Sequence, residues 1–190
     1  MAIKIDRSYA LLIIDMQNDF MPVGTLPVPD SDKIIPVLNK YIDMFVSNKL
    51  PIFATRDWHP QNHMSFKQCG GIWPMHCVKN TFGAGFPSEL RIPRSTTVIS
   101  AGYEYDKEGY SGFEATELNR KLEQKEVKHL LVGGVATDYC VKHTVLDALG
   151  RGLDVVVLED AIKAIKNGEE AIKEMKKKGA KIAKIGDIVA

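Results

Sequence analysis

The chain has 190 residues, of which 45% are hydrophobic and 26% are charged, the composition of an ordinary globular domain. A formal net charge of +1 gives no global electrostatic field that favours nucleic acid or an anionic membrane, and no apolar run reaches transmembrane length. Three cysteines without CxxC spacing favour free thiols in a reducing compartment. We therefore expect one soluble, cytoplasmic domain over residues 1–190 that binds neither nucleic acid nor membrane.

The first half of the chain predicts two buried strands joined by a helix. Residues 10–14 and 51–55 are short apolar runs, typical of strands buried on both faces. Between them, apolar residues recur at helical spacing over residues 31–48. A long irregular segment rich in Gly, Pro, His and aromatic residues follows, over residues 58–94.

The second half predicts four more strands, over residues 96–100, 129–135, 154–158 and 181–185. Helices alternate with these strands. One is expected to open at a capping box, Ser111 to Glu114, and a second to follow residue 135 with Thr137 or Asp138 as its N-cap. A third, rich in Lys and Glu, is expected over residues 168–178.

Alternating strands and helices predict a mostly parallel sheet covered by helices on both sides. In such sheets, functional side chains gather at the carboxyl ends of the strands. Asp15, Asp57 and Cys140 each lie at or just after a predicted strand end. We therefore expect these three side chains to meet at one edge of the sheet.

Cys140 is expected in the first turn of a helix, where unpaired N–H groups and the helix dipole favour a thiolate. It is then either a nucleophile or a buried structural thiol. Asp15 ends a fully apolar strand, so it is either a general base for this thiol or a capping residue. His143, three residues after Cys140 on the same helix, is a less favoured partner for the thiol and is expected to face solvent or an interface.

Asp57 and His59 are two residues apart at a strand end, and His76 lies in the long loop. One carboxylate and two imidazoles suit a divalent transition metal with open coordination positions. The alternative is that these are solvated loop histidines. His63 is expected to support the ligands from behind or to line the cleft.

Five motifs resemble those of the nicotinamidase/pyrazinamidase enzymes, a branch of the isochorismatase-like cysteine hydrolases. They are LLIIDMQNDF (11–20), RDWHPQNHMSF (56–66), WPMHC (73–77), YSGF (110–113) and GGVATDYCV (133–141). The resemblance spans nearly the whole chain. It implies a three-layer α/β fold with a six-stranded sheet in the order 3-2-1-4-5-6.

The resemblance also implies that Cys140 attacks a carboxamide after Asp15 removes its proton. The N–H groups of Ala136 and Cys140 would form an oxyanion hole shaped by a cis peptide between Val135 and Ala136. The product of the implied reaction is nicotinate, formed from nicotinamide with release of ammonia in NAD salvage. Pyrazinamide is the implied second substrate, and a homo-oligomer is expected.

The implied metal is one divalent ion, Zn²⁺ with Fe or Mn as alternatives, held by Asp57, His59 and His76. Phe20 and Trp73 would sandwich the pyridine ring of the substrate. Both aromatic side chains have core packing as the alternative interpretation.

One position departs from the family pattern. The family has a catalytic lysine just after the third strand, where this chain has Ala101. Lys107 is not expected to replace it. Loss of that cation should raise the pKa of Cys140, so we expect metal and ligand binding to survive while turnover falls by orders of magnitude. Ala101 is then either an engineered substitution or a natural variant. For the function, the alternatives are a related small-carboxamide amidase and a non-catalytic protein that binds nicotinamide or nicotinate.

Overall fold

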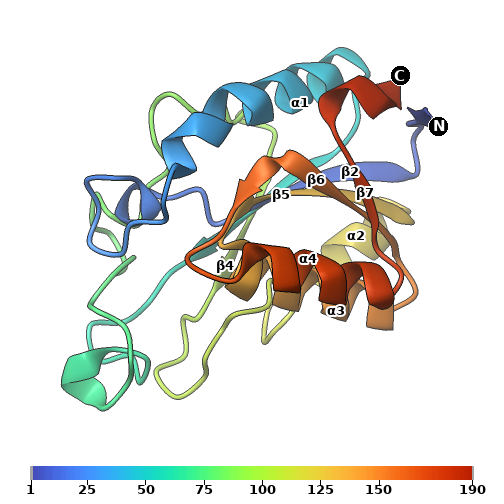
Figure 1. Ribbon diagram of the computed structural model, residues 1–190. Coiled ribbons are helices and arrows are strands. Elements are labelled where there is room, and N and C mark those ends of the chain that lie inside the picture. Colours follow the sequence, from blue (N-terminus) through green and yellow to red (C-terminus); the bar gives the residue numbers. More distant parts are fainter. Residues whose placement is uncertain (1, 190) are drawn as a thin grey trace.

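The computed structural model describes residues 2–189 and contains a six-stranded parallel sheet (Figure 1). Its order is β4-β3-β2-β5-β6-β7, and every neighbouring pair is parallel. The strands are β2 (Tyr9–Ile14), β3 (Ile52–Asp57), β4 (Thr97–Ala101), β5 (His129–Val135), β6 (Asp154–Lys163) and β7 (Lys181–Ala183). Counted as the six predicted strands, this order is 3-2-1-4-5-6, so the expected topology is confirmed.

Helices cover both faces of the sheet, which gives three layers (Figure 1). One face carries α1 (Ile35–Ser47), and the opposite face carries α2 (Leu118–Gln124), α3 (Lys142–Gly150) and α4 (Gly168–Lys177). Short 3-10 turns lie at Asn18–Phe20, Ser31–Ile34, Lys67–Cys69 and Ile185–Asp187. The predicted first helix is therefore a 3-10 turn continued by α1.

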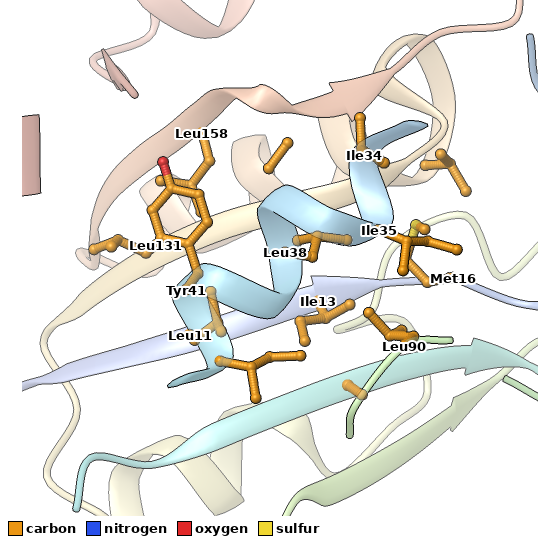
Figure 2. Packing of buried hydrophobic residues seen from close by; sticks show 14 of the residues in the cluster. Leu11, Ile13, Met16, Ile34, Ile35, Leu38, Tyr41, Leu90, Leu131 and Leu158 are labelled. Atoms are coloured by element: carbon orange, nitrogen blue, oxygen red, sulfur yellow. The ribbon is translucent and has the colours of Figure 1, made fainter. Parts of the chain in front are cut away.

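Strand β2 is buried on both sides because successive side chains enter opposite cores. Leu11 and Ile13 pack with Leu38 and Tyr41 of α1, as Figure 2 shows. Leu12, between them, belongs to the core on the face of α3 and α4. Burying each such side chain contributes about 1.5–3 kcal/mol, so the centre of the sheet is a rigid support for the loops at its carboxyl edge.

Two predicted helix starts are wrong. The helix expected from Ser111 begins only at Leu118, because Ala115 adopts a left-handed conformation (φ 52°) that interrupts it, although the Ser111 hydroxyl accepts from the Phe113 N–H (3.2 Å) while donating to Asp147 Oδ2 (2.7 Å). After β5 the chain forms a π-helical turn, Thr137–Val141, before α3, and no side chain caps that turn. The Asp138 carboxylate instead accepts hydrogen bonds from the main-chain N–H groups of residues 165–167.

The ends of the described chain form a second sheet that the sequence did not predict. Strands β1 (Ile3–Lys4) and β8 (Ile188–Val189) pair in parallel. Two-residue strands are too short for a periodic pattern to reveal them. No helix of residues 2–189 is long and apolar enough to cross a membrane.

Candidate active site

Three strand ends bring Asp15, Asp57 and Cys140 together, as expected. One ligand atom from each lies within 4.8 Å of the others, and all three residues are buried. Asp15 follows β2 in a left-handed conformation (φ 47°), and Thr55 of β3 donates its hydroxyl to Asp15 Oδ1 at 2.6 Å. The carboxylate is therefore oriented by the neighbouring strand.

The electrostatic environment of this cluster disfavours negative charge. Burial, and then the charge of Asp57, raise the pKa of Asp15 to about 8. Burial, with Asp15 and Asp57 close by, raises the pKa of the Cys140 thiol well above its usual range. Burial and the two carboxylates therefore oppose the thiolate that the start of a helix favours, and the rise in the pKa has the direction expected from the missing lysine.

The turn that presents Cys140 begins with the expected cis peptide between Val135 and Ala136. Gly134, just before it, has φ 124°, and a Cβ there would lie 2.1 Å from the carbonyl oxygen of Ile14. Only glycine allows β5 to approach β2 this closely. Cys140 and Ala136 both line the cavity described below.

Asp57, His59 and His76 form a second buried cluster with donor atoms within 4.8 Å of one another. The Nε2 atoms of His59 and His76 lie 3.4 Å and 3.7 Å from Asp57 Oδ2. Although burial disfavours its charge, the two imidazoles lower the pKa of Asp57. A permanently charged carboxylate with two imidazoles at this spacing fits a divalent metal.

The backbone fixes the tautomer of each imidazole. His59 Nδ1 lies 2.8 Å from the carbonyl oxygen of Gly102, and His76 Nδ1 lies 2.8 Å from that of Pro74. Each Nδ1 must therefore carry the proton, which leaves the Nε2 lone pairs directed at the cluster. Gly102 has φ 60°, and a Cβ there would lie 2.4 Å from the His59 ring, so this contact depends on glycine.

His63 is not part of this cluster. Its ring centroid lies 4.1 Å from that of His59, but its two nitrogens contact Ser65 Oγ (2.7 Å) and the Lys107 carbonyl oxygen (2.8 Å). Burial, and then the neighbouring His59, lower the pKa of His63 to about 4. The structure therefore places it behind the cluster as a neutral packing residue.

A largely apolar cavity joins the two clusters. Cys140, Asp57, His59 and His76 line it together with Phe20, Leu26, Val28, Trp73, Tyr110, Ala136, Tyr139 and Ile165. The Trp73 indole N–H donates to the Tyr110 hydroxyl at 2.8 Å, and the edge of the ring meets Tyr139 at 5.0 Å between centroids. The cavity can therefore hold a flat apolar ring between a nucleophile and a metal site.

Ala101 is buried at the end of β4 and pairs in register with Asp57. Neighbouring residues of parallel strands project to the same face, so a longer side chain at position 101 would start beside the carboxylates. Lys107 does not replace it, because its ammonium pairs with Glu104 Oε2 (2.8 Å) in an exposed loop. His143 is exposed and stacks on Tyr110, so it stands apart from the thiol.

A parallel α/β fold with a buried cysteine, an adjacent carboxylate and a metal-ligand cluster defines a class of cysteine hydrolases. The chain belongs to the isochorismatase family, whose domain matches residues 9–187. Within that family it is an amidohydrolase of the nicotinamidase/pyrazinamidase branch.

Three relatives support this placement. A pyrazinamidase of Pyrococcus horikoshii, solved in complex with zinc, is 51% identical with a TM-score of 0.91, over 94% of this chain and 99% of its own. PnC1 from L. infantum, solved in complex with nicotinate, is 33% identical with a TM-score of 0.91, over 100% of both chains. The nicotinamidase of Escherichia coli is 36% identical over 94% of this chain and 95% of its own.

Several residues that shape the site were not assigned a role from the sequence. Gln17 is fully buried, donates its amide to the carbonyl oxygens of Asp57 (2.8 Å) and Ala84 (3.0 Å), and accepts from the Asp57 N–H (2.7 Å). The only feature of the sequence that could have indicated this role is that Gln17 is a polar residue three positions after the buried strand β2. Ile165 follows β6, and only the folded chain brings it to the cavity.

Proposed function

We propose that this chain is a metal-dependent nicotinamidase that hydrolyses nicotinamide to nicotinate and ammonia in the cytoplasm. The observation that carries the proposal is that Cys140 and the Asp57, His59, His76 cluster line one apolar cavity, with the buried Asp15 carboxyl within 4.8 Å of the ligand atoms of Cys140 and Asp57. The names of the three relatives, which describe nicotinamidase or pyrazinamidase activity, zinc and nicotinate, agree with this chemistry. Pyrazinamide, another flat carboxamide, is the expected second substrate.

In the first half-reaction the Asp15 carboxylate takes the proton of the Cys140 thiol. The thiolate sulfur then bonds to the carboxamide carbon, and the carbonyl oxygen gains the negative charge. Backbone N–H groups of Ala136 and Cys140 would stabilise that oxyanion. Protonated Asp15 returns its proton to the amide nitrogen, which leaves as ammonia, and a thioester remains on Cys140.

In the second half-reaction a water molecule takes the place of ammonia. Asp15 removes a proton from the water as its oxygen bonds to the thioester carbon. The carbon–sulfur bond then breaks, and nicotinate leaves while Cys140 regains its proton. Asp15 thus serves as base in both halves, and its hydrogen bond from Thr55 keeps it oriented.

Asp57, His59 and His76 would hold the metal, for which Zn²⁺ is our proposal. When bound, a zinc ion supplies Lewis acidity and a contact for the pyridine nitrogen. Phe20 and Trp73 would enclose the ring of the substrate. Tyr110 fixes the indole of Trp73 through its hydroxyl.

We further propose that Ala101 leaves this machinery assembled but slow. The raised pKa values of Asp15 and Cys140 support this, because a cation beside the pair would lower both. The test is ammonia release from nicotinamide by the unmodified chain beside its Ala101→Lys variant, with bound metal measured in both. Lysine should restore turnover, and restored turnover on aliphatic amides instead would favour another small-carboxamide amidase.

A non-catalytic binding protein is the second candidate, favoured by Ala101 itself. It predicts tight binding of nicotinamide or nicotinate that the Ala101→Lys substitution does not convert into hydrolysis. The two candidates share the cavity and differ only in turnover.

A further inference from the structure

The loop between β6 and α4 provides one wall of the cavity. Ile165 lies on this loop and lines the cavity, although the loop lies far along the chain from the nucleophile. Residues 164–167 form neither helix nor strand, although the Asn167 carbonyl oxygen accepts from the Ala171 N–H of α4 (3.1 Å) and Ile165 packs against the core. The main-chain N–H groups of residues 165–167 therefore need hydrogen-bond partners elsewhere in the fold.

A single side chain provides the partners of these three N–H groups. The Asp138 carboxylate accepts three main-chain hydrogen bonds, from Ile165 to Oδ1 (3.0 Å) and from Lys166 and Asn167 to Oδ2 (2.9 and 3.0 Å). Asp138 is buried and belongs to the π-helical turn, two residues before Cys140. One carboxylate thus connects the turn that carries the nucleophile with the loop that carries the cavity wall.

Resting on the proposed function, we propose that Asp138 is a positioning residue that fixes loop 164–167, and through it the Ile165 wall against which the substrate ring packs. Hydrogen bonds to an ionised acceptor are stronger than neutral ones, and three of them converge here. Asp138 itself does not line the cavity, so it acts on the ligand only through the loop.

The Asp138→Asn substitution perturbs this contact selectively. An asparagine has one carbonyl oxygen, and two N–H groups converge on the Oδ2 position. The side chain should therefore keep its oxygen there and turn its NH₂ toward the N–H of Ile165, which loses its acceptor. The substitution keeps the size of the side chain and removes the hydrogen bond to Ile165, the loop residue that lines the cavity.

Asp160 offers a matched control. Its carboxylate also anchors a loop, accepting from the Ile185 N–H (2.9 Å) and from the Tyr41 hydroxyl (2.9 Å). None of these three residues lines the active-site cavity. An effect of general destabilisation would appear in Asp160→Asn as well, whereas an effect on the cavity wall would not.

The test is a double-mutant cycle on nicotinate affinity, measured by calorimetry on the metal-loaded chain. Asp138→Asn should weaken nicotinate binding by about tenfold, and Asp160→Asn by less than about twofold. In the Ile165→Ala background, Asp138→Asn should change the affinity by less than about twofold, because the side chain through which Asp138 acts on the ligand has already been removed. Independent, additive losses from the two substitutions would overturn the proposal.

Amide hydrogen exchange provides a readout that needs no ligand. Asp138→Asn should speed exchange at the amides of residues 165–167 and leave that of Ile185 unchanged. Unchanged exchange in the loop would overturn the proposed anchoring. If the unmodified chain does not bind nicotinate at all, the proposed function fails, whereas the exchange experiment still decides whether Asp138 holds the loop.

Discussion

A cation placed at position 101 should restore the chemistry that this cluster lacks. Asp15, with a pKa of about 8, is ionised in only about one molecule in ten near pH 7. An ammonium within about 4–6 Å lowers a carboxyl pKa by about 1–3 units, and a shift of about two units would leave Asp15 mostly ionised, a gain of about tenfold. The same cation should stabilise the Cys140 thiolate by a similar or larger factor. We therefore expect Ala101→Lys to raise kcat/KM for nicotinamide by about 100-fold or more.

The pH dependence of this rescue has a defined sign. In the unmodified chain the carboxylate form of Asp15 becomes populated as pH rises through about 8, so its own rate should rise with pH. The ratio of Ala101→Lys to unmodified activity should therefore fall by about twentyfold between about pH 6.5 and pH 8.5. Steady-state ammonia release by both proteins across this pH range measures the ratio.

Ala101→Met is the matched control, because methionine has nearly the length of lysine without its charge. It should not restore activity. Equal rescue by methionine would show that filling space matters rather than charge. No rescue by lysine, or near-normal hydrolysis by the unmodified chain, would refute the electrostatic reasoning.

Three further predictions concern the supports of the site. His76→Ala should reduce bound metal well below one ion per chain by elemental analysis, whereas His63→Ala should retain it; equal loss in both would contradict the ligand assignment. Gln17→Leu should lower the free energy of unfolding by about 2–4 kcal/mol in urea titrations, because it strands the buried main-chain groups of Asp57 and Ala84 without hydrogen-bond partners. An unchanged midpoint would show that these groups find other partners. Tyr110→Phe should weaken nicotinate binding about threefold by freeing the Trp73 indole, with metal content unchanged; an unchanged affinity would show that other contacts hold the indole.

Continuous apolar runs predicted the centre of the sheet, because β2 is apolar after Tyr9 and β5 is apolar after His129. The strand expected over residues 129–135 has those bounds in the structure. Because parallel strands share one carboxyl edge, the meeting of Asp15, Asp57 and Cys140 also follows from the strand pattern. What made the metal ligands and the order of the sheet specific was the resemblance of whole motifs.

Local patterns failed where distant partners compete for a side chain. Ser111 and Glu114 have the spacing of a capping box, but the Ser111 hydroxyl donates to Asp147 of α3 and the Glu114 carboxylate accepts from the Gly109 N–H instead of the Ser111 N–H. Asp138 was one of the two residues, with Thr137, expected to cap the following helix, and instead it accepts hydrogen bonds from N–H groups 27–29 residues further along the chain. The raised pKa of Cys140 has the direction expected from the missing lysine, but its causes, burial and the approach of Asp15 and Asp57, exist only in the folded chain.

Nicotinate formation by Ala101→Lys tests the central claim most directly. Chromatography should show that the purified, zinc-loaded Ala101→Lys variant converts nicotinamide to nicotinate, and that the same protein carrying Cys140→Ser does not, because no reactive thiol remains to form the thioester. Absence of nicotinate from the lysine variant, or undiminished formation after Cys140→Ser, would contradict a cysteine-dependent nicotinamidase built on this site.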